Sequence, residues 1–424
     1  METRNTLKWG KKLLAVTLAL MLCVPAFAAL AESSDETVEL TYWAQTDRQN
    51  AFDPLTEAYC AEHPNVKITL SYYDTDGIKD ACKVGASSGT LPSMWFNWGG
   101  SLGSYYAENG CTYDLTTYAE ANDWTNKFNP GVLSLCTLDG QLCGYPTNIS
   151  VLGVFYNKSV FEKYGITAPT TFDELEQVCA TLKENGVVPF STAGLYGWHV
   201  MRILEQFIEY YAGSELHDQL QAMTTSWNCE PVIQALTKYQ EWCQKGYFPD
   251  GFLTNDPNDT FLAVAIGQCA MDLQGQWYDS TILGNDLSVD DYDWYAFPNG
   301  TGRMSAFAEM TQLNANLTDA QLNAAIDYLD YIFSNESAQS DYSKYMNLPL
   351  PTLDTLVPET QPHVSEMYDY SKEYGTFTIT DQAFPTVVAD VLFDMQDALY
   401  SGTVTPEEAA ANIDEAVQSY LASN

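Results

Sequence analysis

The chain has 424 residues, with 18 Lys or Arg against 56 Asp or Glu, and its formal net charge is −38. Nucleic acids and anionic membrane surfaces bind through clustered Lys and Arg, so both make poor partners for this chain. Hydrophobic residues make up 46% and aromatic residues 13%, which favours a large folded core over a disordered acidic chain.

Residues 1–31 have the pattern of a secretory signal peptide. Four basic residues precede an apolar run over Leu13–Cys23, and Ala29-Leu30-Ala31 forms a small-x-small cleavage site. The run is shorter than the ~20 residues that span a membrane, so we expect secretion to the extracellular face of the cytoplasmic membrane. A lipid anchor at Cys23 is an alternative, but the bulky Leu-Met-Leu before it does not favour lipoprotein cleavage. Nine cysteines follow the signal, and their disulfide pairing stays open.

Strands and helices alternate after the signal peptide. The segments 38–44, 66–73 and 93–98 have strand patterns, and helical segments begin near Gln49 and Gly77 between them. This order predicts βαβ units and a parallel sheet. About 390 residues follow the signal, which suggests two domains or lobes.

N-terminal capping patterns predict where later helices begin. Thr171 with Glu174 and Thr318 with Gln321 have the capping-box spacing, and Pro406 begins the last helix. We find no internal repeat and no long linker, so the lobes should be joined by short crossovers.

Four tryptophans stand in unusual places. Trp43 and Trp98 follow predicted strands, where ligands of open α/β sheets bind, and Trp198 and Trp277 stand beside glycine breaks. An aromatic ring covers the apolar C–H face of a pyranose, and neighbouring amides and carboxylates satisfy the hydroxyls. These four rings therefore predict sugar-binding platforms. Trp242 has helical spacing instead and is predicted to pack against other side chains.

The motifs of common enzymes are absent from the sequence. There is no nucleophile elbow, zinc-protease motif, P-loop or dinucleotide fingerprint, and no cysteine or histidine cluster has zinc spacing. We therefore expect no catalysis, no cofactor and no metal. A secreted glycoside hydrolase or lyase stays open as an alternative, because so many acids supply candidate catalytic pairs. A cationic small-molecule ligand is a second alternative, because the chain is acidic and rich in aromatic rings.

Two longer stretches carry a resemblance to a known family. Residues 144–191 read GYPTNISVLGVFYNKSVFEKYGITAPTTFDELEQVCATLKENGVVPFS, and residues 261–280 read FLAVAIGQCAMDLQGQWYDS. FPNG at 297–300 and NLPLPTL at 347–353 are shorter landmarks. With these motifs the chain, over about Val38–Ala422, resembles extracellular solute-binding protein family 1 of ABC sugar importers, the group that includes maltose-binding protein.

The resemblance implies an α/β fold of the class II periplasmic-binding-protein type, with two lobes that close on a carbohydrate about a hinge. It implies a monomer that delivers an oligosaccharide to the permease subunits of an ABC transporter. The N-terminal lobe is expected at 38–146 plus 304–345 and the C-terminal lobe at 147–303 plus 346–424. Ser150 stands where some relatives have a polar or acidic ligand contact, so the sugar preference of those relatives cannot be transferred to this chain. The implied ligand-binding residues are Trp43, Asp47, Arg48, Trp98, Tyr145, Asn148, Trp198 and Trp277.

Overall fold

The computed structural model describes residues 37–138, 140–346 and 359–423. The predicted signal peptide, the alternative lipid site at Cys23 and the landmark at 347–353 lie outside the described residues. Among the residues that are described, no helix is both long and apolar enough to cross a membrane.

One continuous sheet of nine strands organises the described chain, in the order β2-β1-β3-β10-β6-β8-β7, with β9 beside β6 and β11 beside β10. β1 is parallel to both β2 and β3, as the βαβ pattern predicts. The strands are β1 (Val38–Gln45), β2 (Val66–Tyr73), β3 (Met94–Trp98), β6 (Tyr145–Asn157), β7 (Val188–Phe190), β8 (Cys269–Gly275), β9 (Tyr292–Tyr295), β10 (Met304–Leu313) and β11 (Thr376–Thr378), and a separate hairpin consists of β4 (Thr137–Leu138) and β5 (Gln141–Leu142).

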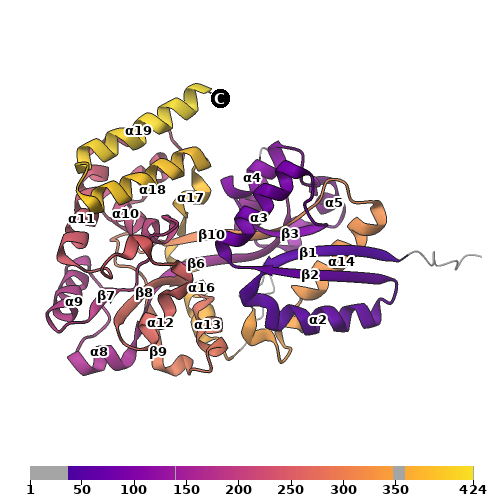
Figure 1. The fold of residues 1–424 in the computed structure, drawn as a ribbon, viewed down its shortest axis with the longest axis horizontal. Coiled ribbons are helices and arrows are strands. Elements are labelled where there is room, and N and C mark those ends of the chain that lie inside the picture. The colour runs from indigo at the N-terminus through magenta and orange to yellow at the C-terminus, as the bar shows by residue number, and fades with distance from the viewer. Residues whose placement is uncertain (1–36, 139, 347–358, 424) are drawn as a thin grey trace, which may run out of the picture.

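Strands β6 and β10 belong to both halves of the molecule. β6 pairs with β10 over Tyr145–Val151 and then with β8 over Leu152–Tyr156. β10 pairs with β11 over Met304–Ala306 and with β3 over Glu309–Leu313. Both strands therefore run from one half into the other through the middle of the molecule (Figure 1). Two lobes joined by crossover strands confirm the predicted α/β fold class.

Helices cover the sheet in each half, and both predicted capping boxes form. Thr171 accepts from the backbone N–H of Glu174 to begin α9, and Thr318 accepts from Gln321 to begin α14. The helices are α2 (Gln49–Glu62), α3 (Thr75–Ser88), α4 (Ser101–Glu108), α5 (Thr116–Ala121), α6 (Trp124–Lys127), α7 (Pro130–Cys136), α8 (Lys158–Tyr164), α9 (Phe172–Glu184), α10 (Trp198–Gln221), α11 (Glu230–Lys245), α12 (Thr260–Ala265), α13 (Tyr278–Gly284), α14 (Asp319–Ile332), α15 (Asn335–Ala338), α16 (Pro362–Tyr374), α17 (Thr380–Ala383), α18 (Thr386–Ser401) and α19 (Pro406–Ser423).

Each lobe has its own hydrophobic core. One core draws on residues 40–145 and 308–346, with Val364 added. The other draws on residues 152–297 and 379–417, with Phe307 added. The cores separate along β6 and β10. The assignment of lobe boundaries to single residues stays a prediction.

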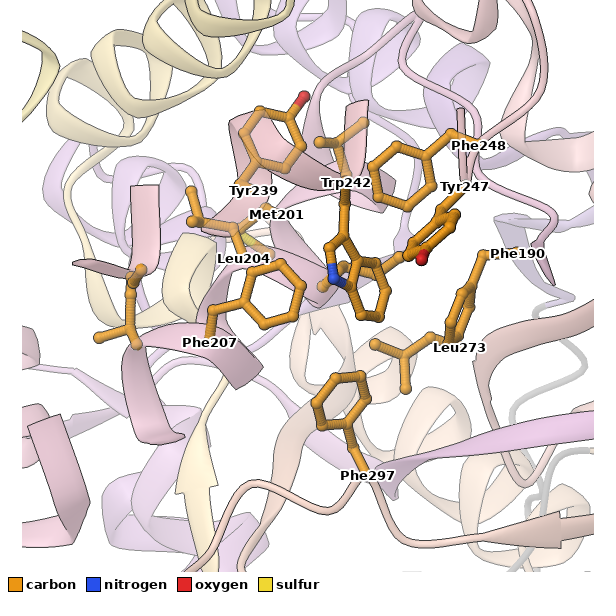
Figure 2. Packing of buried hydrophobic residues seen from close by; sticks show 14 of the residues in the cluster. Phe190, Met201, Leu204, Phe207, Tyr239, Trp242, Tyr247, Phe248, Leu273 and Phe297 are labelled. Atoms are coloured by element: carbon orange, nitrogen blue, oxygen red, sulfur yellow. The ribbon is translucent and has the colours of Figure 1, made fainter. Parts of the chain in front are cut away.

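Trp242 lies at the centre of the second core, as its helical spacing predicts. Its side chain on α11 is fully buried. The rings of Phe207 and Phe190 have their centroids 4.9 and 5.4 Å from the Trp242 ring and lie on opposite sides of it in Figure 2, where Phe297 lies below the ring. This packing makes Trp242 a reference for a structural tryptophan, against which the tryptophans of the site can be compared.

Candidate functional site

A cavity of about 850 Å³ lies between the two lobes. The first lobe contributes the ends of β1, β2 and β3 and the start of α3, and the second contributes the start of α10, the end of β8 and the turn before α13. Its size lies within the ~300–1,000 Å³ typical of small-molecule sites. The cavity therefore lies at the carboxyl ends of parallel strands, where open α/β sheets bind their ligands.

Three tryptophans and two cations alternate along the wall of this cavity. The ammonium of Lys79 lies 5.0 Å from the ring centroid of Trp98 and 5.5 Å from that of Trp198. The guanidinium carbon of Arg202 lies 4.6 Å from the ring of Trp198 and 5.3 Å from that of Trp277. All five side chains line the cavity, and we call them the aromatic ladder. Trp98 and Lys79 come from the first lobe and the other three from the second.

Paired glycines explain how Trp98 reaches the cavity. Trp98 is the last residue of β3, and the chain turns at Gly99-Gly100 into α4. Gly100 has a φ of 62°, and a Cβ on it would lie 2.4 Å from the carbonyl oxygen of Gln382 in the other lobe. A Cβ on Gly99 would lie 2.6 Å from the carbonyl oxygen of Leu135. Only glycines fit this turn, so the local sequence places an aromatic ring directly at the edge of the lobe interface.

A third glycine provides the surface on which the Trp277 ring lies. β8 ends at Gly275, and a Cβ there would lie 1.9 Å from Cζ3 of Trp277. Phe307 packs against the same ring, with 5.6 Å between the two centroids. The Gly-Gln-Trp order of the sequence therefore lets the indole fold back over its own strand, half-buried and with part of its surface in the cavity.

The two lobes touch across the cavity through Trp198. Its indole Nε1–H donates to Oδ1 of Asp76 on α3 at 3.3 Å, and the same oxygen accepts from Lys79 at 3.2 Å. Burial raises the pKa of the Asp76 carboxyl, although the Lys79 charge acts in the opposite direction. Asp74, the residue before α3, caps the helix by accepting from the backbone N–H of Gly77 at 2.6 Å. The start of α3 thus presents acidic groups to the second lobe.

A buried polar network holds Arg202 in place. Its Nη1 donates to Oε1 of Gln274 at 2.9 Å, and only 7% of the residue is exposed. Burial lowers the pKa of Arg202 to about 10. Beneath it, His199 lies 3.3 Å from the Asp272 carboxylate, and burial lowers the pKa of that imidazole. The second lobe therefore holds a fixed, desolvated cation against two tryptophan rings.

A second buried network lies behind the cavity where β6 and β10 pair. Glu309 lines the cavity, and its carboxylate accepts from Arg48 at 2.5 Å. The pairing of β10 with β6 shifts register between Glu309 and Met310. Nδ2 of Asn148 donates to Oγ of Ser150 at 3.0 Å and reaches Glu309 at 3.5 Å. These side chains fix the floor of the cavity to the strands that join the lobes.

Four of the eight residues predicted as ligand contacts line the cavity: Asp47, Trp98, Trp198 and Trp277. The other four do not. Arg48 and Asn148 lie behind Glu309, and the hydroxyl of the buried Tyr145 donates to the partly exposed carboxylate of Asp330 at 2.6 Å. β1 continues to Gln45, so Trp43 is not at the strand end and packs on Tyr73 with 5.5 Å between centroids. Whether any of the eight contacts a ligand stays a prediction.

The sequence reasoning missed Lys79, Arg202, Gln274 and Asp381, all of which line the cavity. Lys79 lies in the first turns of α3, directly after β2. Its position near the carboxyl end of a strand could have indicated a place in the ligand site. Arg202 lies one helical turn after Trp198. No group of three or more His, Cys, Asp or Glu in the described chain is arranged to hold a metal ion.

Comparison with known proteins gives the family. The family model for bacterial extracellular solute-binding proteins matches residues 43–339. An uncharacterized ABC transporter extracellular-binding protein of Pyrococcus horikoshii is 27% identical over 252 residues, which span 57% of this chain and 57% of that protein. The multiple sugar-binding protein of Streptococcus mutans is 20% identical over 421 residues, 93% of this chain and 98% of that one.

A solved structure of a chitin oligosaccharide binding protein superposes with a TM-score of 0.80 at 21% identity, and it covers 90% of this chain and 98% of its own. At that identity the superposition supports the fold alone, and the fold is the two-lobe architecture described above. Because the family model covers well over half of the sequence, the assignment does not depend on any single relative. The chain belongs to the bacterial extracellular solute-binding proteins.

Proposed function

We propose that this protein binds a carbohydrate of oligosaccharide size in the cavity between its lobes and delivers it to the permease of an ABC transporter. The observation that carries the proposal is the aromatic ladder, in which tryptophans of both lobes line one cavity. Rings on both lobes suit the apolar faces of a sugar, and Gln274, Asn258 and Asp381 supply the planar polar groups that its hydroxyls need.

Trp98, Trp198 and Trp277 act as the stacking platforms in this proposal, and Asp47 is a polar contact at the first lobe. Arg48 and Asn148 act indirectly, because they hold Glu309 at the cavity wall. The lobes close about β6 and β10, and closure excludes water from the sugar. Affinity then depends on both lobes being in contact with the ligand.

The protein acts outside the cytoplasm as a monomeric receptor without catalysis. Its relatives are binding proteins rather than enzymes, and neither the hydrolase nor the cationic small-molecule alternative is favoured by them. The family implies an extracellular or periplasmic location, but it does not determine how the protein is attached to the membrane.

The test is a thermal-shift screen of the secreted chain, without its signal peptide, against mono- and oligosaccharides, followed by small-angle scattering and product analysis. We expect a sugar that raises the melting temperature, lowers the radius of gyration and is recovered intact. A sugar that is cleaved would make the protein an enzyme. A panel in which no carbohydrate binds, or a bound sugar that leaves the radius of gyration unchanged, would contradict the proposed receptor and its closure.

A further inference from the structure

The ring faces that a sugar would need are in contact with protein cations. Lys79 lies between Trp98 and Trp198, and Arg202 lies between Trp198 and Trp277, at the 4.6–5.5 Å separations given above. Arg202 is fixed by Gln274 and is almost fully buried. The Lys79 side chain is 24% exposed, and its only ion pair among the described residues is with Asp76. Lys79 is therefore the cation that a ligand can displace.

Removing Lys79 from this position has an electrostatic cost. Asp76 is buried, and its Oδ2 has no hydrogen-bond partner among the described residues. Asp381 lines the same cavity, and the charges of Lys79 and Arg202 offset part of the burial that raises the pKa of its carboxyl. A neutral sugar that displaced Lys79 would leave Asp76 without its ion pair and remove a positive charge that acts on Asp381. Buried carboxylates without a counter-charge are strongly disfavoured.

We propose that the ligand is an amino sugar, and that its protonated amine takes the position between Trp98 and Trp198 that the Lys79 ammonium occupies. The inference rests on the proposed function, since it concerns the same cavity. An ammonium there would keep the cation–π contacts with two rings and restore the charge beside Asp76. The cavity lining is acidic overall, because Asp47, Asp74, Glu309 and Asp381 outnumber Lys79 and Arg202.

Charge also favours this ligand class at long range. The whole chain has a net charge of −38, so its field attracts a cationic sugar and repels a uronic acid. A charge-assisted hydrogen bond and a cation–π contact together give an expected preference of about tenfold to hundredfold for an amine over the matching hydroxyl.

Isothermal titration calorimetry with matched sugars tests the preference. The probes are glucosamine against glucose, galactosamine against galactose, and β-1,4-linked glucosamine trimer against cellotriose. We expect the amine to bind more tightly within the pair that binds, and the preference to fall when the pH is raised until the amine is neutral. Equal or tighter binding of the hydroxyl sugars overturns the inference and leaves the proposed function standing. If no sugar of either kind binds here or in the wider panel, the proposed function itself fails.

Two substitutions in α3 test whether the preference for an amine depends on the Asp76 carboxylate. Asp76→Asn keeps an oxygen for the Trp198 indole but removes the charge, and Asp80→Asn makes the same charge change at an exposed position of α3. We expect Asp76→Asn to remove most of the amine preference within the matched pair of sugars that binds. Asp80→Asn should keep the preference. If the two variants behave alike, the carboxylate of Asp76 does not recognise the amine, and the inference is wrong.

Discussion

Gly275→Ala should displace the Trp277 ring from its place in the cavity without replacing the tryptophan itself. The added Cβ would lie 1.9 Å from Cζ3 of the ring, so the indole must leave its place over β8. Gly275 does not have a positive φ, and alanine is therefore acceptable to the backbone. The clash with the ring is the dominant effect of the substitution.

The expected magnitudes follow from this geometry. Loss of one ring–sugar stack should weaken binding by about 1–3 kcal/mol, a roughly tenfold to hundredfold higher Kd. The clash should lower the free energy of unfolding by about 1–3 kcal/mol. Trp277→Ala should weaken binding equally, and its stability cost should stay below the ~3–5 kcal/mol expected for Trp242→Ala, because Trp277 is only half-buried.

The assay is a double-mutant cycle with calorimetric titration of the sugar found in the panel and urea unfolding of each variant. Gly275→Ala with Trp277→Ala should bind no more weakly than Trp277→Ala alone, since the clash disappears with the ring. Gly284→Ala is the control, because a Cβ there meets no atom within 4 Å. If Gly275→Ala binds sugar as tightly as the wild-type protein, the Trp277 ring is not a platform and the reasoning fails.

Three further predictions concern other parts of the structure. Arg48→Met should lower the free energy of unfolding in urea by about 3–5 kcal/mol, because it leaves the buried Glu309 carboxylate unpaired. Adding Glu309→Gln should recover most of that free energy. A double variant that recovers none of it would contradict the pairing. Trp43→Ala should lower the melting temperature yet leave the sugar Kd unchanged, since Trp43 does not line the cavity; a tenfold weaker Kd would make it a ligand contact. Glu209 on α10 is paired with His217 and Arg303. Burial raises the pKa of its carboxyl, but its hydrogen bonds with His217, Arg303 and Thr301 outweigh burial and lower it to about 2. Its contribution of about 3 kcal/mol is therefore present above pH ~4.5 and lost as the pH falls toward 2, and Glu209→Gln should remove that acid-dependent part of the unfolding curve.

The sequence predicted the parts of the fold that depend on local patterns. Strand alternation gave β1, β2 and β3, and the capping boxes at Thr171 and Thr318 gave the starts of two helices, because each signal lies within a few residues. Trp98, Trp198 and Trp277 were predicted from glycine breaks, and the fold brings these distant positions to one cavity. The glycines restrict where a bulky ring can go, which is why the three rings meet in one cavity, and their contact with a ligand stays a prediction.

The rest of the site depends on contacts that local patterns do not contain. Asp76 and Lys79 have the i, i+3 spacing of an ordinary exposed helical ion pair, and only the opposite lobe turns them into cavity residues. Tyr145 and Asn148 lie on β6 near the predicted crossover, yet strand pairing with β10 turns their side chains into the buried interior. Trp43 differs from Trp98 because β1 extends past it by two residues.

The alternation of lobes along the aromatic ladder has a consequence for affinity. Trp98 and Lys79 belong to the first lobe, whereas Trp198, Arg202 and Trp277 belong to the second. When the lobes are apart, neither set alone can surround a sugar ring, and each ring gives only a partial contact. In the proposed mechanism, the stacking energy of both lobes is gained only in the closed form, and the ligand favours closure by the difference between the contacts in the two forms. The buried Arg48–Glu309 pair lies beside the strands that both lobes share, so the proposed closure would leave this part of the cavity floor in place.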